Sequence, residues 1–133
     1  MPIVKQLSIF LVNEPGVLHG VCGALSEAGI DILALMVTDT VDHAVVRFIV
    51  SDPAKAQEVL EEGNLFVVDN RVNEIPLPSR AGILAELAGE LSKAKVNIEY
   101  AYGSTTGPQG TLYLRAKDPE AAEKIIAKFL AKK

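Results

Sequence analysis

Residues 13–18, Asn-Glu-Pro-Gly-Val-Leu, have the composition of an anion-binding helix start. They follow an apolar, β-branched run at residues 7–12 and precede apolar residues at helical spacing, which predicts a strand that turns directly into a helix. Pro15 suits the first helical turn, Gly16 keeps a Cβ away from the opening, and Asn13 can accept hydrogen bonds from the amides beyond it. Such amides and the helix dipole favour a carboxylate or a phosphate. A well-capped turn without a ligand would explain the same residues.

The remaining reactive side chains form no catalytic or metal-binding pattern. His19 and His43 fall on different predicted elements, and neither has a neighbouring nucleophile or metal-ligand partner at a useful spacing. Gly16, Gly20 and Gly23 fit neither the dinucleotide-binding fingerprint nor the phosphate loop. The sequence therefore predicts a protein that is not an enzyme and that holds no cofactor or metal.

The composition fits a soluble globular protein with one or two small domains. The chain has 133 residues, 49% of them hydrophobic, a formal net charge of −4 and scattered lysines and arginines. Without a basic stripe, nucleic acid is not expected as a partner; Tyr100 and Tyr102 could stack on bases but suit core or partner packing better. The single cysteine, Cys22, is predicted to be a small buried hydrophobic residue. No apolar run reaches the roughly 18 to 20 residues of a transmembrane helix, and no basic region leads into a signal peptide, so we expect a cytoplasmic protein.

The chain contains two copies of one unit, offset by 66 residues. The matched positions share their residue types: Gly16 and Gly82, Leu18 and Leu84, Leu25 and Leu91, Ile32 and Ile98, and Asp52-Pro53 and Asp118-Pro119. Two large copies indicate two like-folded subdomains and not a solenoid. We therefore expect one domain at residues 1–69 and a second at residues 70–133.

Each copy has the pattern β-α-β-β-α-β. In the first copy we predict strands at residues 4–12, 30–38, 43–50 and 65–69, and helices at residues 15–28 and 53–62. In the second copy we predict strands at residues 71–77, 96–104 and 109–117, and helices at residues 80–95 and from residue 119. Right-handed crossovers place both helices on one face of a four-stranded antiparallel sheet, which makes the fold class α+β with two ferredoxin-like units. Val45 and Ile49 make the other face of the first sheet partly apolar, so the other copy or a second chain should pack there.

The second copy departs from the first in three respects. It has no room for its own last strand, and residues 65–69 and 71–77 are close enough in sequence to form one long strand serving both copies. Its middle hairpin carries a loop at residues 105–110 that is either a lid or a permissive turn. Its first helix opens with Ser-Arg-Ala-Gly at residues 79–82, which keeps the glycine but loses the asparagine and the proline.

These features together resemble the ACT domain, a small amino-acid-sensing module attached to many enzymes of amino-acid metabolism. The resemblance rests on Asn-Glu-Pro-Gly-Val-Leu at the helix start, Ala-Gly-Ile-Asp-Ile at the entry to the second strand, and the repeated 66-residue unit. Because it covers essentially the whole chain, it implies a stand-alone tandem ACT protein. In that family, two units pair side by side into an eight-stranded sheet, and effector amino acids bind at the seam.

The resemblance also implies which residues bind an effector. The loop before the first helix holds the effector with amides and a polar side chain, and a polar residue at the start of the next strand comes from the facing unit. The corresponding positions are Asn13, Gly16, Val17, Leu18 and Asp31 in the first copy, and Ser79, Gly82, Ile83, Leu84 and Asn97 in the second. Asn97 matches the asparagine usual in the family, whereas Asp31 carries a charge, so the best site would join residues 13–18 to Asn97.

The sequence thus predicts a regulatory protein that binds an amino acid effector. It would act through ligand-dependent pairing with itself, as a homodimer, or with an enzyme of amino-acid metabolism. The second loop would be weaker, differently selective or empty. The alternative is an interaction and oligomerisation platform with vestigial ligand sites, which the degenerate second loop and the apolar sheet face would also explain.

Overall fold

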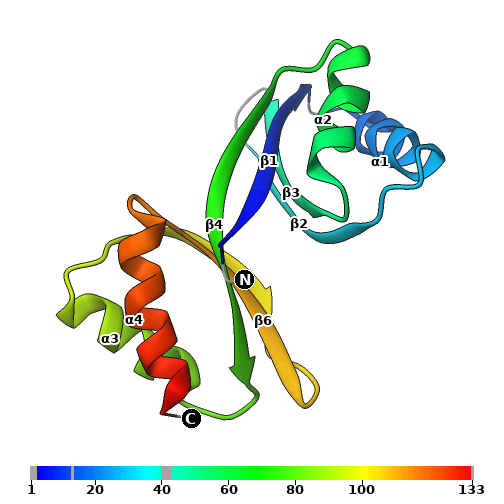
Figure 1. Ribbon diagram of the computed structural model, residues 1–133. Coiled ribbons are helices and arrows are strands. Elements are labelled where there is room, and N and C mark those ends of the chain that lie inside the picture. The colour runs from blue at the N-terminus through cyan, green and yellow to red at the C-terminus, as the bar shows by residue number, and fades with distance from the viewer. Residues whose placement is uncertain (1–2, 13, 40–42, 133) are drawn as a thin grey trace. The chain divides into compact units, whose positions relative to one another are not determined.

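The computed structural model describes residues 3–12, 14–39 and 43–132. Ten elements follow one another along the chain (Figure 1). They are β1 (Ile3–Val12), α1 (Val17–Glu27), β2 (Ile32–Asp39), β3 (His43–Val50), α2 (Pro53–Glu62), β4 (Val67–Pro78), α3 (Ile83–Lys93), β5 (Ile98–Ser104), β6 (Gln109–Ala116) and α4 (Pro119–Ala131). No helix in these ranges is both long and apolar enough to cross a membrane.

The chain divides into two compact units, each an α+β sheet with two helices on one face (Figure 1). The first unit comprises Lys5–Asn70, and its strands lie in the order β2-β3-β1-β4. Its core lies between the sheet and α1 and α2, and includes Leu7, Ile9, Leu25, Phe48 and Leu60, all nearly inaccessible to solvent. The predicted ferredoxin-like antiparallel fold is confirmed, because β3 runs antiparallel to both β1 and β2.

The second unit comprises Arg71–Lys133 and the start of β1. Its strands lie in the order β5-β6-β4, with β1 as the next neighbour of β4. The unit does lack a last strand of its own, as predicted, and residues 3 and 4 stand in that place. β4 is a single strand that begins in the first unit and continues into the second.

Matching caps begin the second helix of each unit. The Asp52 carboxylate accepts a hydrogen bond from the amide of Lys55 at 3.2 Å, and the Asp118 carboxylate accepts one from Ala121 at 3.1 Å. A proline follows each aspartate at the first helical position, where it has no amide to leave unpaired. These caps and their 66-residue offset were predicted from the sequence and are confirmed.

The strands of the two units present different open faces, opposite the helices of each unit. In the first unit Phe10 and Val12 are each 50% exposed on this face, and Phe10 lies opposite Val45. In the second unit the rings of Tyr102 and Tyr113 stack with their centroids 5.5 Å apart, so Tyr102 packs against a tyrosine of the neighbouring strand in its own unit. The open face of the first unit is therefore apolar at one end, and that of the second is aromatic.

Candidate functional site

The candidate site begins at a tight turn that precedes α1. Gly16 has φ 87° and ψ −14°, and the amide of Val17 donates to the Glu14 carbonyl at 3.4 Å. These values describe a type II turn with Pro15 and Gly16 at its centre. The helix therefore begins at Val17, and the prediction that Pro15 starts it was wrong: Pro15 fixes the turn that comes before the helix. Asn13 lies outside the described residues.

Gly16 is required for a reason other than the one predicted. A Cβ added there would meet nothing within 4 Å, so space is not the constraint. The constraint is the positive φ, which costs a non-glycine residue about 1–2 kcal/mol. Val17 and Leu18, the next two predicted site residues, are half-buried and pack against the core of the first unit. Their side chains therefore hold the helix start in place, while the first-turn amides have no acceptor within the helix.

The second unit repeats the turn without its proline. Gly82 has φ 88°, and the amide of Ile83 donates to the Arg80 carbonyl at 3.4 Å. Ala81 takes the place of Pro15, so the turn does not need the proline. The helix begins at Ile83 and not at the predicted residue 80. Ile83 is buried, whereas Leu84 is half exposed.

An ion pair lies at the start of α3, the first helix of the second unit. The Arg80 guanidinium donates two hydrogen bonds to the Glu86 carboxylate, at 2.7 and 2.8 Å. Glu86 lies in the first turn of α3 and 3.8 Å from the place of a Cβ on Gly82, so the favourable end of the helix dipole already has a carboxylate. In the first unit no acidic residue lies in the first turn of α1, because Gly20 occupies the equivalent position. The loop residues by themselves do not indicate this difference, because Gly20 and Glu86 lie beyond the loops, inside the helices.

Ser79 is engaged in a contact that the sequence did not indicate. Its hydroxyl donates to the Thr105 carbonyl, and the Ser104 and Thr106 hydroxyls lie 2.9 Å apart in a hydrogen bond. Gly110 is buried, and a Cβ there would come within 2.2 Å of the Ser104 carbonyl oxygen. These contacts hold the two ends of the loop at residues 105–110 in place, and the Ser79 hydrogen bond is one of them.

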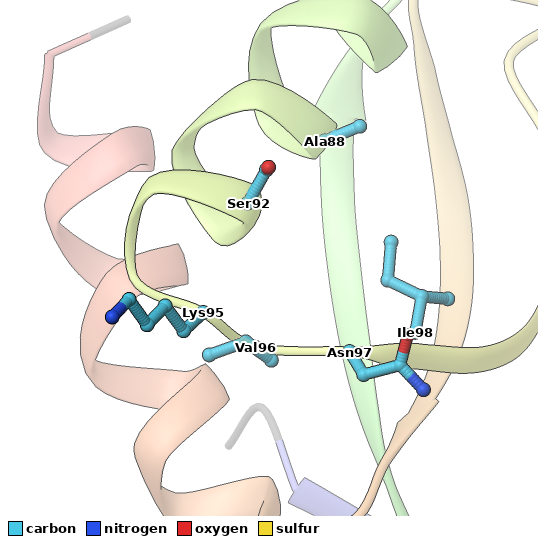
Figure 2. Close-up of a pocket in the computed structure, with 6 residues that line it drawn as sticks. All are labelled: Ala88, Ser92, Lys95, Val96, Asn97 and Ile98. Atoms are coloured by element: carbon cyan, nitrogen blue, oxygen red, sulfur yellow. The ribbon is translucent and has the colours of Figure 1, made fainter.

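Asp31 and Asn97 lie where each first helix has ended and the next strand begins. The Asp31 amide donates to the Ser51 hydroxyl at 2.9 Å, and Asp31 is exposed. Asn97 lines an open hollow of about 430 Å³ beside the end of α3. Figure 2 shows Ser92 on α3 and Asn97 at the strand entry among the residues that line the hollow, with the Lys95 side chain extending away from Asn97.

Within one unit, the two halves of the predicted site are not brought together. Gly16 stands at one end of α1 and Asp31 follows the other end, and an 11-residue helix is about 16 Å long. Gly82 and Asn97 are separated in the same way by α3, which also has 11 residues. A small ligand cannot reach both halves in a single unit. A complete site of the predicted kind would need a second unit facing the first.

A buried polar contact outside the predicted site lies on the second sheet. The Tyr113 hydroxyl donates to the Glu74 carboxylate at 2.9 Å. Burial, together with this hydrogen bond to a negative group, raises the pKa of Tyr113 to about 12. Among the described residues no group of three or more His, Cys, Asp or Glu side chains could hold a metal ion.

Comparisons with known proteins agree with the fold. The chain matches the family model of the ACT domain pair over residues 2–132. It resembles the crystal structure of a Bacteroides thetaiotaomicron protein with a TM-score of 0.91 and 32% identity, over 95% of this chain and 88% of that one. No protein with a curated description matches it.

Structures of aspartate kinase share the fold at lower identity. The ligand-free regulatory subunit from Thermus thermophilus has a TM-score of 0.71 and 18% identity, over 97% of each chain. E. coli aspartokinase III, in complex with lysine and aspartate, has a TM-score of 0.60 and 17% identity, over 99% of this chain and 31% of that one. The family match spans both repeats and agrees with the strand order found in each unit. This chain therefore belongs to the ACT domain family and is an ACT domain pair.

Proposed function

We propose that this ACT domain pair is a regulatory protein that binds an amino acid at the start of α1. The observation that carries the proposal is the glycine turn at Gly16, which leads into a helix with no acidic residue in its first turn. The amides there and the helix dipole suit an α-carboxylate. The equivalent start of α3 faces Glu86 and suits an anion less well.

The other half of the site would come from a facing unit of a second copy. Asn97 is exposed and lines a hollow, so its side-chain oxygen can accept a hydrogen bond from an α-ammonium group. Asp31, at the equivalent position of the first unit, is also exposed and offers a carboxylate. A zwitterion with these few contacts would bind in the micromolar to millimolar range, about −4 to −8 kcal/mol. Binding would favour the paired state, because each partner supplies half of the contacts.

We further propose an enzyme of amino-acid metabolism as the regulated partner. The fold is shared along 97% of both chains with a regulatory subunit of aspartate kinase, which supports a regulatory role. An effector and a partner of this kind would place the protein in the cytoplasm.

A platform without a ligand is the second candidate. Its support is the apolar open face of the first unit, where Phe10 and Val12 are half exposed, together with the ion pair that occupies the second helix start. On this view the protein would hold partners together whatever the amino acid concentration.

A thermal-shift screen of the full chain against the common amino acids, followed by calorimetry on any hit, separates the two. A sensor is stabilised by one amino acid or a related few. It should also shift toward larger assemblies in sedimentation when that amino acid is added. A flat melting temperature across all of them would reject the sensor and favour the platform.

A further inference from the structure

The most exposed large apolar side chain among the described residues is Phe66, at 74%. It lies in the short connection between α2, which ends at Glu62, and β4, which begins at Val67, so it is close in sequence to the C-terminal end of that helix. A single exposed aromatic ring is costly to leave in water, since burying it is favourable in proportion to its apolar area. Phe66 is therefore a candidate anchor for a partner.

The second unit has a hollow beside its own two helices, α3 and α4. Its volume is about 280 Å³, larger than the engineered cavity of about 150 Å³ that is known to bind benzene. Ala94, Ile125 and Phe129 give it apolar walls from the ends of α3 and α4. Its charged lining consists of one acidic residue, Glu90, and three lysines, Lys93, Lys128 and Lys132, and we call this feature the basic hollow.

The two places are related by charge reversal. Subtracting the 66-residue offset from Lys93, Lys128 and Lys132 gives Glu27, Glu62 and Phe66. Where the second unit has three lysines around a hollow, the first unit thus has two glutamates and an exposed ring, which we call the acidic knob. Both glutamates are exposed, and neither has an ion-pair partner among the described residues. Lys93 pairs with Glu90 at 3.3 Å, a weak exposed pair, whereas Lys128 and Lys132 have no such partner in the described chain.

The acidic knob places negative charge at the C-terminal end of a helix, where the helix dipole favours positive charge. Glu61 and Glu62 end α2, and no basic residue lies in its last turn, although the C-terminal end of a helix favours cations. Glu58 and Glu62 are four residues apart, a spacing at which like charges destabilise a helix. A basic surface brought against this end would relieve both costs.

The charge imbalance extends to whole units. Residues 5–70 contain three basic and ten acidic residues, a formal charge of −7. The remaining residues contain ten basic and seven acidic residues, a formal charge of +3. Attraction between copies is therefore expected when unlike units approach, and repulsion when first units approach each other.

We infer that two copies of this chain associate by insertion of the acidic knob of one copy into the basic hollow of another. Phe66 would fill the apolar part of the hollow. Glu27 and Glu62 would pair with the surrounding lysines. This contact is separate from the amino acid site and does not depend on a ligand, so it can stand if the proposed function fails.

The first test is sedimentation velocity on the full chain, dialysed free of amino acids, over a range of concentrations. The wild type should self-associate at about 0.1 M salt and much less at about 1 M, where the Debye length falls from about 10 Å to about 3 Å. Phe66→Ala should weaken association at least tenfold, about 1.4 kcal/mol. Phe10→Ala, which truncates an exposed ring on the open face of the same unit, should leave association unchanged. A monomeric wild type, or equal effects of the two alanines, would overturn the inference.

A charge exchange tests the pairing itself. Glu27→Lys/Glu62→Lys and Lys93→Glu/Lys128→Glu should each lose self-association, because knob and hollow then carry like charges. An equimolar mixture of the two variants should associate again, and so should the chain with all four substitutions. All four positions are exposed, so circular dichroism should show an intact fold. A mixture that stays unassociated would contradict the proposed contact.

Discussion

Arg80 and Glu86 bridge the start of α3 with two hydrogen bonds of 2.7 and 2.8 Å, and the start of α1 has no equivalent bridge. Gly20 stands at the position equivalent to Glu86, and Glu14 at the position equivalent to Arg80. The two copies therefore have the same backbone turn with different electrostatics. This difference leads to the first prediction.

Gly20→Glu should place a carboxylate in the first turn of α1 and weaken amino acid binding about three- to tenfold. The unfolding free energy should rise by up to about 1 kcal/mol, because glycine is a poor helix former and a Cβ at this position meets nothing within 4 Å. Calorimetry and urea unfolding would measure the two effects. Gly20→Gln is the matched control: it shares the gain in helix propensity, lacks the charge that interacts with the helix dipole, and should leave the affinity unchanged.

Gly16→Asp should abolish amino acid binding, because a carboxylate would stand beside the amides that receive the ligand. Any side chain at this positive φ also costs about 1–2 kcal/mol, so stability alone is not informative. Gly16→Asn has nearly the same shape and tolerates this conformation equally well. If both variants lose binding to the same degree, strain and not charge is responsible, and the ligand carboxylate does not lie at this turn.

Asn97→Ala and Asp31→Ala identify the residue that completes the site. Both side chains are exposed, so neither change should lower the melting temperature by more than a degree or two. We expect Asn97→Ala to weaken binding about tenfold through loss of one hydrogen bond to a charged group, and Asp31→Ala to weaken it less. The reverse order would place the effector against the first unit of the facing chain.

Tyr113 makes stability depend on pH in the alkaline range. Its pKa in the folded protein is raised to about 12, so the neutral form is favoured there. Stability should be unaffected below the unfolded pKa of about 10 and should fall as pH rises from about 10 to about 12, by about 1–2 kcal/mol. Urea unfolding of the wild type and of Tyr113→Phe at several alkaline pH values measures how much the ionisation of Tyr113 contributes to this loss of stability. Parallel pH profiles for the two proteins would rule it out.

Asn73 should be important for stability although it lies outside the site. It is fully buried, and its amide donates to the Pro119 carbonyl at 3.1 Å, which ties β4 to the start of α4. Asn73→Ala should lower the unfolding free energy by about 1–2 kcal/mol, through a cavity and the loss of this hydrogen bond. Chemical denaturation would measure it. Asn70→Ala, on the same strand but only half-buried, should cost clearly less.

Local signals in the sequence determined most of the elements. The Asp52-Pro53 and Asp118-Pro119 caps fix helix starts through contacts three residues apart, so α2 and α4 begin where they were predicted. The strand β3 and the 66-residue repeat follow from side-chain pattern alone. Together with the resemblance to the ACT domain, these sequence features predicted the family and the positions of the two glycine turns.

Tertiary structure decided what depends on distant partners or on backbone angles. The helices α1 and α3 begin at Val17 and Ile83, later than predicted, because Gly16 and Gly82 adopt positive φ. Glycine permits this conformation but does not require it. Residues 3 and 4 complete the second unit because strand pairing joins positions far apart in the chain. The Arg80–Glu86 ion pair, the Ser79 contact and the helix length that separates each loop from its strand entry depend on geometry that spacing does not encode.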